Sequence, residues 1–83
     1  MGYKIAFKAS VARDLKKLDR EQADRILARI EEELPEKAEA FPTLKGQFSG
    51  LRKFRVGDYR VIYTILGDTA LVLRISHRSA VYR

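Results

Sequence analysis

The sequence LRKFRVGDYRVIY, at positions 51–63, decides the fold of this 83-residue chain. Two runs rich in β-branched and aromatic residues flank Gly57-Asp58, a dipeptide typical of the tight turn between antiparallel strands. The stretch therefore predicts a β-hairpin. Cations inside a strand pattern need a physical reason, and this hairpin carries several of them: Arg52, Lys53, Arg55 and Arg60.

A second turn dipeptide, Gly67-Asp68, extends the hairpin into three strands, which we expect at residues 51–56, 59–66 and 69–76. If both loops hold two residues, positions equally distant from a turn face each other all along the strands. One face of the sheet then carries Lys53 opposite Ile62 and Arg55 opposite Arg60. The other face carries apolar residues that we expect in the core: Phe54, Val61, Tyr63 and Val72.

Upstream of the hairpin, the sequence predicts a strand followed by two helices. Alternation of apolar and polar residues over positions 3–8 indicates a strand with one buried face. Ser10 should cap a short helix that has apolar residues at helical spacing, namely Val11, Leu15 and Leu18.

The second helix should begin after Asp19, which resembles a capping box with Gln22, and should span about residues 20–34. Pro35 should end this helix, because the residue before a proline is biased away from the helical conformation. A loop over residues 35–50 leads to the hairpin. We therefore predict a single α+β domain over residues 1–83, with a two-helix hairpin on a mainly antiparallel sheet of about four strands.

The positive charge is concentrated in the second half of the chain. Lys and Arg balance Asp and Glu over residues 1–43, whereas residues 44–83 contain eight cations and only Asp58 and Asp68, which accounts for the net charge of +6. Such asymmetry is typical of proteins that bind a polyanion, although a solvated basic surface is the simpler alternative. The absence of cysteine and of a secretory signal or apolar membrane segment favours a cytoplasmic protein.

The order of these elements, together with several short motifs, resembles the RelE family of toxins within the RelE/ParE superfamily. The motifs are Leu44-Lys45-Gly46, Leu51-Arg52, residues 57–63 and His77-Arg78-x-x-Val81-Tyr82. The resemblance implies a toxin that cleaves messenger RNA in the ribosomal decoding site without a metal ion. It also implies a co-expressed antitoxin that wraps around the toxin and inactivates it.

The resemblance implies catalytic roles for Lys53, Arg60, Arg78 and Tyr82, and the chemistry of these side chains agrees with such roles. Attack of a 2′-hydroxyl on the adjacent phosphate needs a base, cations for the developing charge and an acid for the leaving oxygen. We expect Lys53 to act as the base, since neighbouring cations should depress its pKa. Arg60 and Arg78 would hold the phosphate, and Tyr82 would protonate the leaving oxygen or stack on a base.

His77 competes for the proton-transfer role, because the unperturbed pKa of histidine lies near 6.5. Four further cations of the second half are predicted to bind RNA phosphates or to be solvated: Lys45, Arg52, Arg55 and Arg74. No metal site is expected, since the two carboxylates of this half are predicted in turns.

Two other functions remain open at the level of the sequence. RelE-type sites often carry two lysines two residues apart in the first hairpin strand, whereas Leu51 occupies the earlier position here. The related ParE toxins poison DNA gyrase and do not cut RNA, which makes a gyrase poison the main alternative. A basic nucleic-acid-binding module without toxicity is the second. For either toxin, an acidic amphipathic antitoxin segment is the expected partner.

Overall fold

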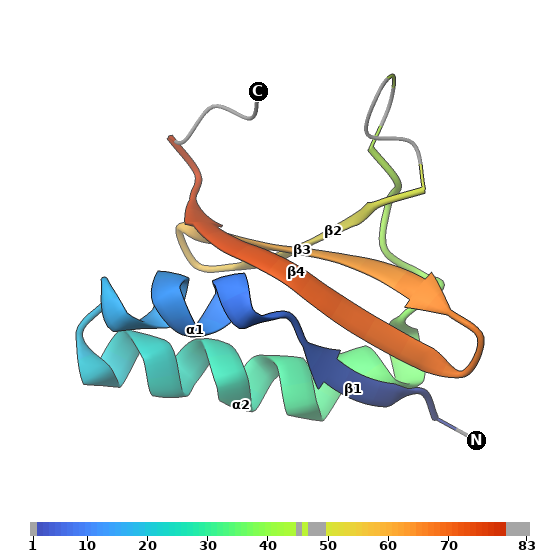
Figure 1. Cartoon of the computed structure of the whole chain (residues 1–83), viewed down its shortest axis with the longest axis horizontal. Helices are drawn as coiled ribbons and strands as arrows, with labels where there is room; N and C mark the ends of the chain where they lie inside the picture. Colours follow the sequence, from blue (N-terminus) through green and yellow to red (C-terminus); the bar gives the residue numbers. More distant parts are fainter. Residues whose placement is uncertain (1, 45, 47–49, 80–83) are drawn as a thin grey trace.

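The elements follow the predicted order of strand, two helices and three strands (Figure 1). The computed structural model describes residues 2–44, 46 and 50–79. In chain order the elements are β1 (Lys4–Phe7), α1 (Ala9–Lys16), α2 (Arg20–Lys37), β2 (Arg52–Val56), β3 (Tyr59–Leu66) and β4 (Thr69–His77). The strands form one four-stranded sheet in the order β1-β4-β3-β2, in which β1 runs parallel to β4 and the other neighbours are antiparallel. The predicted α+β architecture is confirmed.

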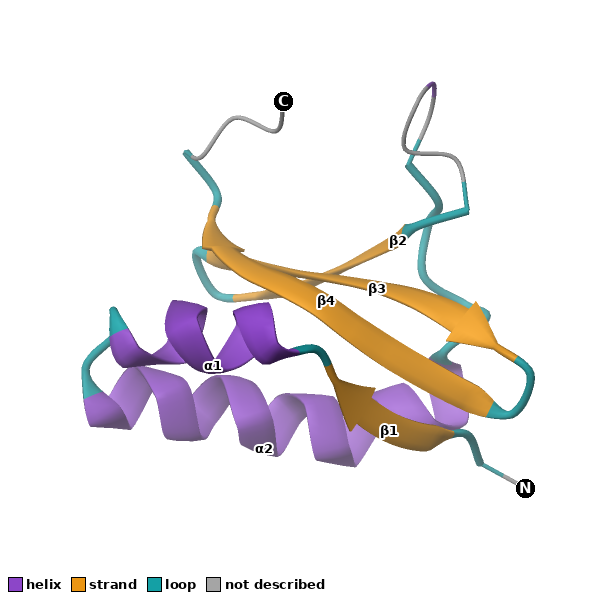
Figure 2. Ribbon diagram, in the orientation of Figure 1, coloured by secondary structure: helices purple, strands orange, loops and turns teal. Residues whose placement is uncertain are grey.

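Both helices lie on the same side of the sheet, so the opposite face carries no helix (Figure 2). The core fills the space between these two layers. It contains Val11 from α1, the stripe of α2 and the inward side chains of the strands, among them the predicted Phe54, Val61, Tyr63 and Val72. None of the helices in the described part of the chain is long and apolar enough to cross a membrane.

The first hairpin has the predicted register. Arg55 pairs with Arg60 and Lys53 pairs with Ile62 across Gly57-Asp58. Gly57 has a φ of 58°, in the left-handed region that glycine adopts without steric cost. Lys53, Arg55 and Arg60 therefore face away from the helices, as expected from the alternation of strand side chains.

The second hairpin departs from the predicted register at its middle. Tyr63 pairs with Val72 as expected, but Ile62 pairs with Arg74, which leaves Leu73 as an extra residue in a β-bulge. Uninterrupted alternation after Val72 would turn Arg74 towards the core and Ile75 towards water. The bulge reverses this, and Ile75 is 4% exposed. The expectation of equal spacing along the whole strand was thus wrong, because burying an unpaired arginine costs more than one unpaired strand residue.

The helix boundaries require two corrections. Ser10 does not cap α1, because Lys8 is the residue at the N-cap and Ser10 lies inside the helix, where its hydroxyl donates to the Leu73 carbonyl at 2.6 Å. Pro35 does not end α2, which continues to Lys37. Leu34 is fully buried in the core, and this packing outweighs the local bias that proline imposes. The predicted cap by Asp19 is confirmed, since its side chain accepts from the Gln22 N–H at 2.8 Å.

Candidate functional site

The face of the sheet that lacks helices carries two rows of residues across β2, β3 and β4. One row is Arg55, Arg60 and Ser76, and the next is Lys53, Ile62 and Arg74. We call Lys53, Arg55 and Arg60 the cationic face. Opposed residues of neighbouring strands have Cβ atoms about 4.5–5.5 Å apart, which applies to Arg55 and Arg60, and Lys53 follows in the next row on the same face.

Arg78 lies at the same end of the sheet as Arg55 and Arg60, where it contacts Asp58 in the turn between β2 and β3. Its N–H donates to the Asp58 carbonyl at 2.7 Å, and its Nε lies 3.7 Å from Asp58 Oδ1. The second described carboxylate of this half, Asp68, lies in the other turn, where Oδ2 is 3.6 Å from Lys4 Nζ. The two carboxylates therefore lie in the two turns and not among the residues of the cationic face. Among the described residues, no group of three or more His, Asp or Glu side chains could hold a metal ion.

Arg52 lies on the opposite side of the strand from Lys53 and serves the protein's own backbone. Its Nη1 donates to the carbonyls of Glu39 at 3.1 Å and Phe41 at 2.8 Å, just beyond the end of α2. The Tyr63 hydroxyl donates to the Ala38 carbonyl at 2.6 Å in the same region. Burial raises the pKa of Tyr63 to about 12, against a smaller opposing effect of the Arg52 charge. Arg52 thus contacts the backbone beyond the end of α2, and the RNA-facing role expected of it stays a prediction.

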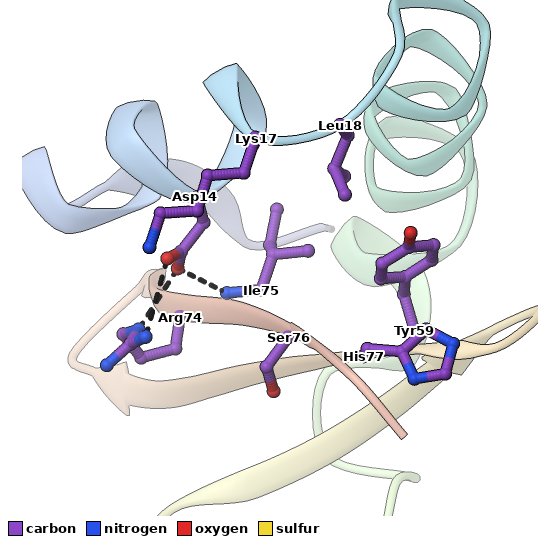
Figure 3. Close-up of a pocket in the computed structure, with 8 residues that line it drawn as sticks. All are labelled: Asp14, Lys17, Leu18, Tyr59, Arg74, Ile75, Ser76 and His77. Atoms are coloured by element: carbon purple, nitrogen blue, oxygen red, sulfur yellow. Dashed lines mark hydrogen bonds and ion pairs between the residues drawn. The ribbon is translucent and has the colours of Figure 1, made fainter. Parts of the chain in front are cut away.

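Arg74, in the same row as Lys53, also has a partner within the protein. Its Nε lies 3.0 Å from Asp14 Oδ2 and its Nη2 lies 3.4 Å from Asp14 Oδ1 (Figure 3). The Asp14 side chain is 8% exposed, and its Oδ2 also accepts from the Ile75 N–H at 2.9 Å. A buried carboxylate on α1 thus holds the Arg74 guanidinium, while the Arg74 side chain stays 56% exposed, and its RNA-facing role stays a prediction.

Sequence reasoning did not single out Asp14, although a signal was present. Asp14 follows Val11 by three positions and precedes Leu18 by four, so it belongs to the apolar stripe of the first helix. A carboxylate on a buried stripe needs partners from elsewhere in the fold. Those partners lie some sixty positions away in the chain, at Arg74 and Ile75, and only the folded structure brings them together.

His77 lies on the helix side of the sheet rather than with Arg60. It pairs with Tyr59, and the two rings meet edge to face with centroids 5.3 Å apart. Its Nδ1 is 2.8 Å from the Ser79 Oγ. The structure therefore places His77 on the opposite face of the sheet from Lys53 and Arg60, and the proton-transfer role expected of His77 stays a prediction. Strand alternation is the reason, since Ser76 rather than His77 is opposite Arg60.

His77 and Tyr59 instead line a shallow groove of about 290 Å³ between α1 and the end of β4 (Figure 3). The groove is lined by Asp14, Lys17, Leu18, Tyr59, Arg74, Ile75, Ser76 and His77. The predicted site residues Lys45 and Tyr82 lie outside the described residues. The arrangement that remains is a cationic surface with Arg78 at its edge, which suits a phosphate chain.

Solved structures of toxin–antitoxin proteins are similar to this chain. It is 26% identical to a chain of the RelBE2 toxin–antitoxin complex from Mycobacterium tuberculosis, covering 94% of this chain and 100% of that chain with a TM-score of 0.86. It is also 26% identical to a chain of the RelE–RelB complex from Pyrococcus horikoshii, covering 98% and 100% with a TM-score of 0.68. A chain of the ParDE system from Pseudomonas aeruginosa has the same fold at 16% identity, covering 90% and 95% with a TM-score of 0.72.

The family model that matches describes the ParE toxin of the type II toxin–antitoxin system parDE, and it covers residues 5–82. No curated protein matches the sequence. The family match spans nearly the whole chain, and the fold agrees with both RelE and ParE relatives. This chain therefore belongs to the ParE toxin family of type II toxin–antitoxin systems, within the RelE/ParE superfamily.

Proposed function

We propose that this toxin is an endoribonuclease that cuts messenger RNA on the ribosome and that a cognate antitoxin neutralises it in the cytoplasm. The observation that supports this activity is the cationic face. Arg55 and Arg60 are opposed across β2 and β3, with Lys53 in the next row. Opposed like charges weaken a sheet, so an anionic ligand explains their presence better than stability does.

The proposed reaction is a transesterification within the RNA backbone. The 2′-oxygen attacks the adjacent phosphorus, the bond from phosphorus to the 5′-oxygen breaks, and the products are a 2′,3′-cyclic phosphate and a 5′-hydroxyl. Lys53 accepts the proton of the 2′-hydroxyl, and the leaving 5′-oxygen takes a proton from Tyr82. Arg60 and Arg78 stabilise the charge that develops on the phosphate oxygens, with Arg55 holding a neighbouring phosphate.

The ribosome and the antitoxin are the partners that this proposal requires. The ribosome would supply the confinement that positions the message for attack on the cationic face. An acidic antitoxin segment would cover the same charges. Binding of a partner to the folded toxin alone stabilises it, by about 2.7 kcal/mol at a free concentration one hundred times the Kd. Several similar structures are toxin–antitoxin complexes, which supports a partner of this kind.

The experiment is primer extension on a defined message that is held on purified translating ribosomes and incubated with the toxin. The proposal expects new stops within the codon in the decoding site, and 5′-hydroxyl ends that become ligatable only after phosphorylation. Intact message at toxin concentrations equal to those of the ribosomes would refute it. The same message without ribosomes serves as the control for contaminating nucleases.

Poisoning of DNA gyrase is the second candidate function, and two observations favour it. The matching family model is described for the ParE toxin of parDE, and Leu51 takes the place of a lysine that RelE-type sites often carry. This alternative expects inhibition of gyrase-catalysed supercoiling of a relaxed plasmid, with messenger RNA left intact. Running both assays on one preparation separates the two functions.

A further inference from the structure

Beyond Val72, one edge of β4 still pairs with β3, but the other edge lies against α1 instead of against a strand. β1 pairs with β4 only as far as Val72, and the Lys8 N–H donates to the Val72 carbonyl as the chain turns into α1. From this point the edge of β4 needs other partners for its outward backbone groups. Figure 1 shows α1 running beside this part of β4.

Two side chains of α1 supply those partners on either side of the β-bulge. The Ser10 hydroxyl donates to the Leu73 carbonyl at 2.6 Å, and Asp14 Oδ2 accepts from the Ile75 N–H at 2.9 Å. Leu73 is the extra residue of the bulge. Helix side chains thus take over the pairing of the strand edge at the place where its register shifts.

The bulge determines which residues of β4 accompany the cationic face. With it, Ser76 is opposite Arg60 and the following tail brings the Arg78 N–H to the Asp58 carbonyl. Without it, β4 would slip by one residue, which is about 3.3 Å, and Ile75 would face Arg60. Each later side chain would then turn to the opposite face of the sheet.

We propose that Asp14 is a positioning residue that holds β4 in the shifted register and so places Ser76 and Arg78 beside the cationic face. The role as a positioning residue for RNA rests on the proposed function, whereas the effect on register does not.

The chemistry of Asp14 suits this role. Oδ2 accepts both the Ile75 N–H and the Arg74 Nε–H, while Oδ1 lies 3.4 Å from Arg74 Nη2 (Figure 3). These donors satisfy a carboxylate that is almost completely buried. The Arg74 guanidinium is also kept on the outer side of the strand, so the same side chain stabilises both the backbone and the orientation that the bulge produces.

The test compares Asp14→Ala with Asp14→Asn and with the control Asp19→Ala. Asparagine keeps an oxygen that can accept from the Ile75 N–H, whereas alanine does not. Asp19→Ala removes the cap of α2, which destabilises the protein at a place remote from β4. Nuclear Overhauser effects between Arg60 and Ser76 report the register, hydrogen exchange of the Ile75 amide reports its hydrogen bond, and fluorescence anisotropy reports the Kd for a single-stranded RNA.

Asp14→Ala is expected to lose the nuclear Overhauser effects between Arg60 and Ser76. Hydrogen exchange of the Ile75 amide should become at least tenfold faster, and the Kd for single-stranded RNA should rise at least tenfold. Asp14→Asn should keep the register and a Kd within about threefold of wild type, and Asp19→Ala should change neither quantity. An Asp14→Ala protein that keeps the pairing, or an Asp19→Ala protein that loses as much affinity, would overturn the proposal.

If Asp14→Ala does not fold, Asp14→Leu replaces it, because leucine fills the buried stripe but accepts no hydrogen bond. The same losses are expected, and retention of the register in that variant would refute the role of Asp14. The register measurements use no RNA. A wild-type protein that binds no RNA would therefore count against the proposed function, while the register of the variants would still show whether Asp14 holds β4.

Discussion

Replacing Arg55 by glutamine should make the folded protein more stable while weakening its binding to RNA. Arg55 is exposed and pairs directly with Arg60, so its charge opposes folding at that position. Glutamine keeps a long polar side chain and removes the charge. A residue that is retained for the stability of the sheet would show the reverse behaviour.

The expected gain in stability of Arg55→Gln follows from the pairing of Arg55 with Arg60. A directly opposed pair of like charges costs about 0.2–1 kcal/mol. With an unfolding entropy of about 2.1 cal/mol/K per residue, an 83-residue chain changes its Tm by about 3 °C for 0.5 kcal/mol. Because the Debye length falls to about 3 Å in 1 M salt, the gain should largely disappear there. The salt dependence of RNA binding should also weaken, by about 0.7 in the slope of log K against log salt.

Thermal unfolding followed by circular dichroism at low and high salt measures the first effect, and anisotropy titrations over the same salt range measure the second. Lys16→Gln is the matched control, since it removes one exposed cation from the last turn of α1. The control should leave the Tm unchanged or lower it slightly, because a cation there favours the helix dipole. A Tm of Arg55→Gln at or below that of wild type at low salt would show that the opposed charges do not weaken the sheet.

Three further predictions concern residues around the site. The wild-type free energy of unfolding should fall as the pH rises from about 10 towards 12. The pKa of Tyr63 is about 12 in the folded protein and about 10 in the unfolded protein, so in this range the folded state keeps a proton that the unfolded state has lost. Urea unfolding of Tyr63→Phe should lack this part of the decline. Arg52→Ala should lower the free energy of unfolding by about 1–3 kcal/mol in urea titrations, through loss of its bonds to two carbonyls, yet raise the RNA Kd less than Arg60→Ala does. Gly57→Ala should cost about 1–2 kcal/mol in the same titrations, since the φ of Gly57 is 58°.

The first hairpin was predictable because local chemistry determines it. Gly57-Asp58 defines the turn, and alternation then assigns Lys53, Arg55 and Arg60 to one face without knowledge of the rest of the chain. The bulge in β4 is only weakly indicated by the sequence. Apolar residues alternate at Ala70 and Val72, but the next apolar residue of that face is Ile75, because position 74 is an arginine.

The long side chains show why the rest of the site could not be predicted. Arg52 and Arg74 appear in the sequence as strand cations, as Lys53 and Arg60 do, yet each finds an acceptor from a distant segment. The acceptors are the carbonyls beyond α2 for Arg52 and the carboxylate of Asp14 for Arg74. Such partners depend on how helices pack beside the sheet, which hydrophobic periodicity does not specify.

The two incorrect helix boundaries have the same origin. Ser10 has the chemistry of a cap and Pro35 the chemistry of a helix end, but tertiary contacts determine both outcomes. The Ser10 hydroxyl serves the edge of β4, and the burial of Leu34 keeps α2 helical through the proline. Local preferences of a fraction of a kcal/mol to a few kcal/mol yield to contacts of equal or larger size.

Whether the cationic face acts on RNA can be measured directly, as the rate of message cleavage on translating ribosomes by Arg60→Ala compared with Arg13→Ala. Arg13 is an exposed cation on α1, so its removal changes the net charge equally without touching the face. We predict a loss of at least about 100-fold for Arg60→Ala, the scale of removing one donor to a developing oxyanion, and wild-type rates for Arg13→Ala. Equal rates for the two variants, or a wild-type toxin that leaves the message intact, would contradict a role of this face in RNA cleavage.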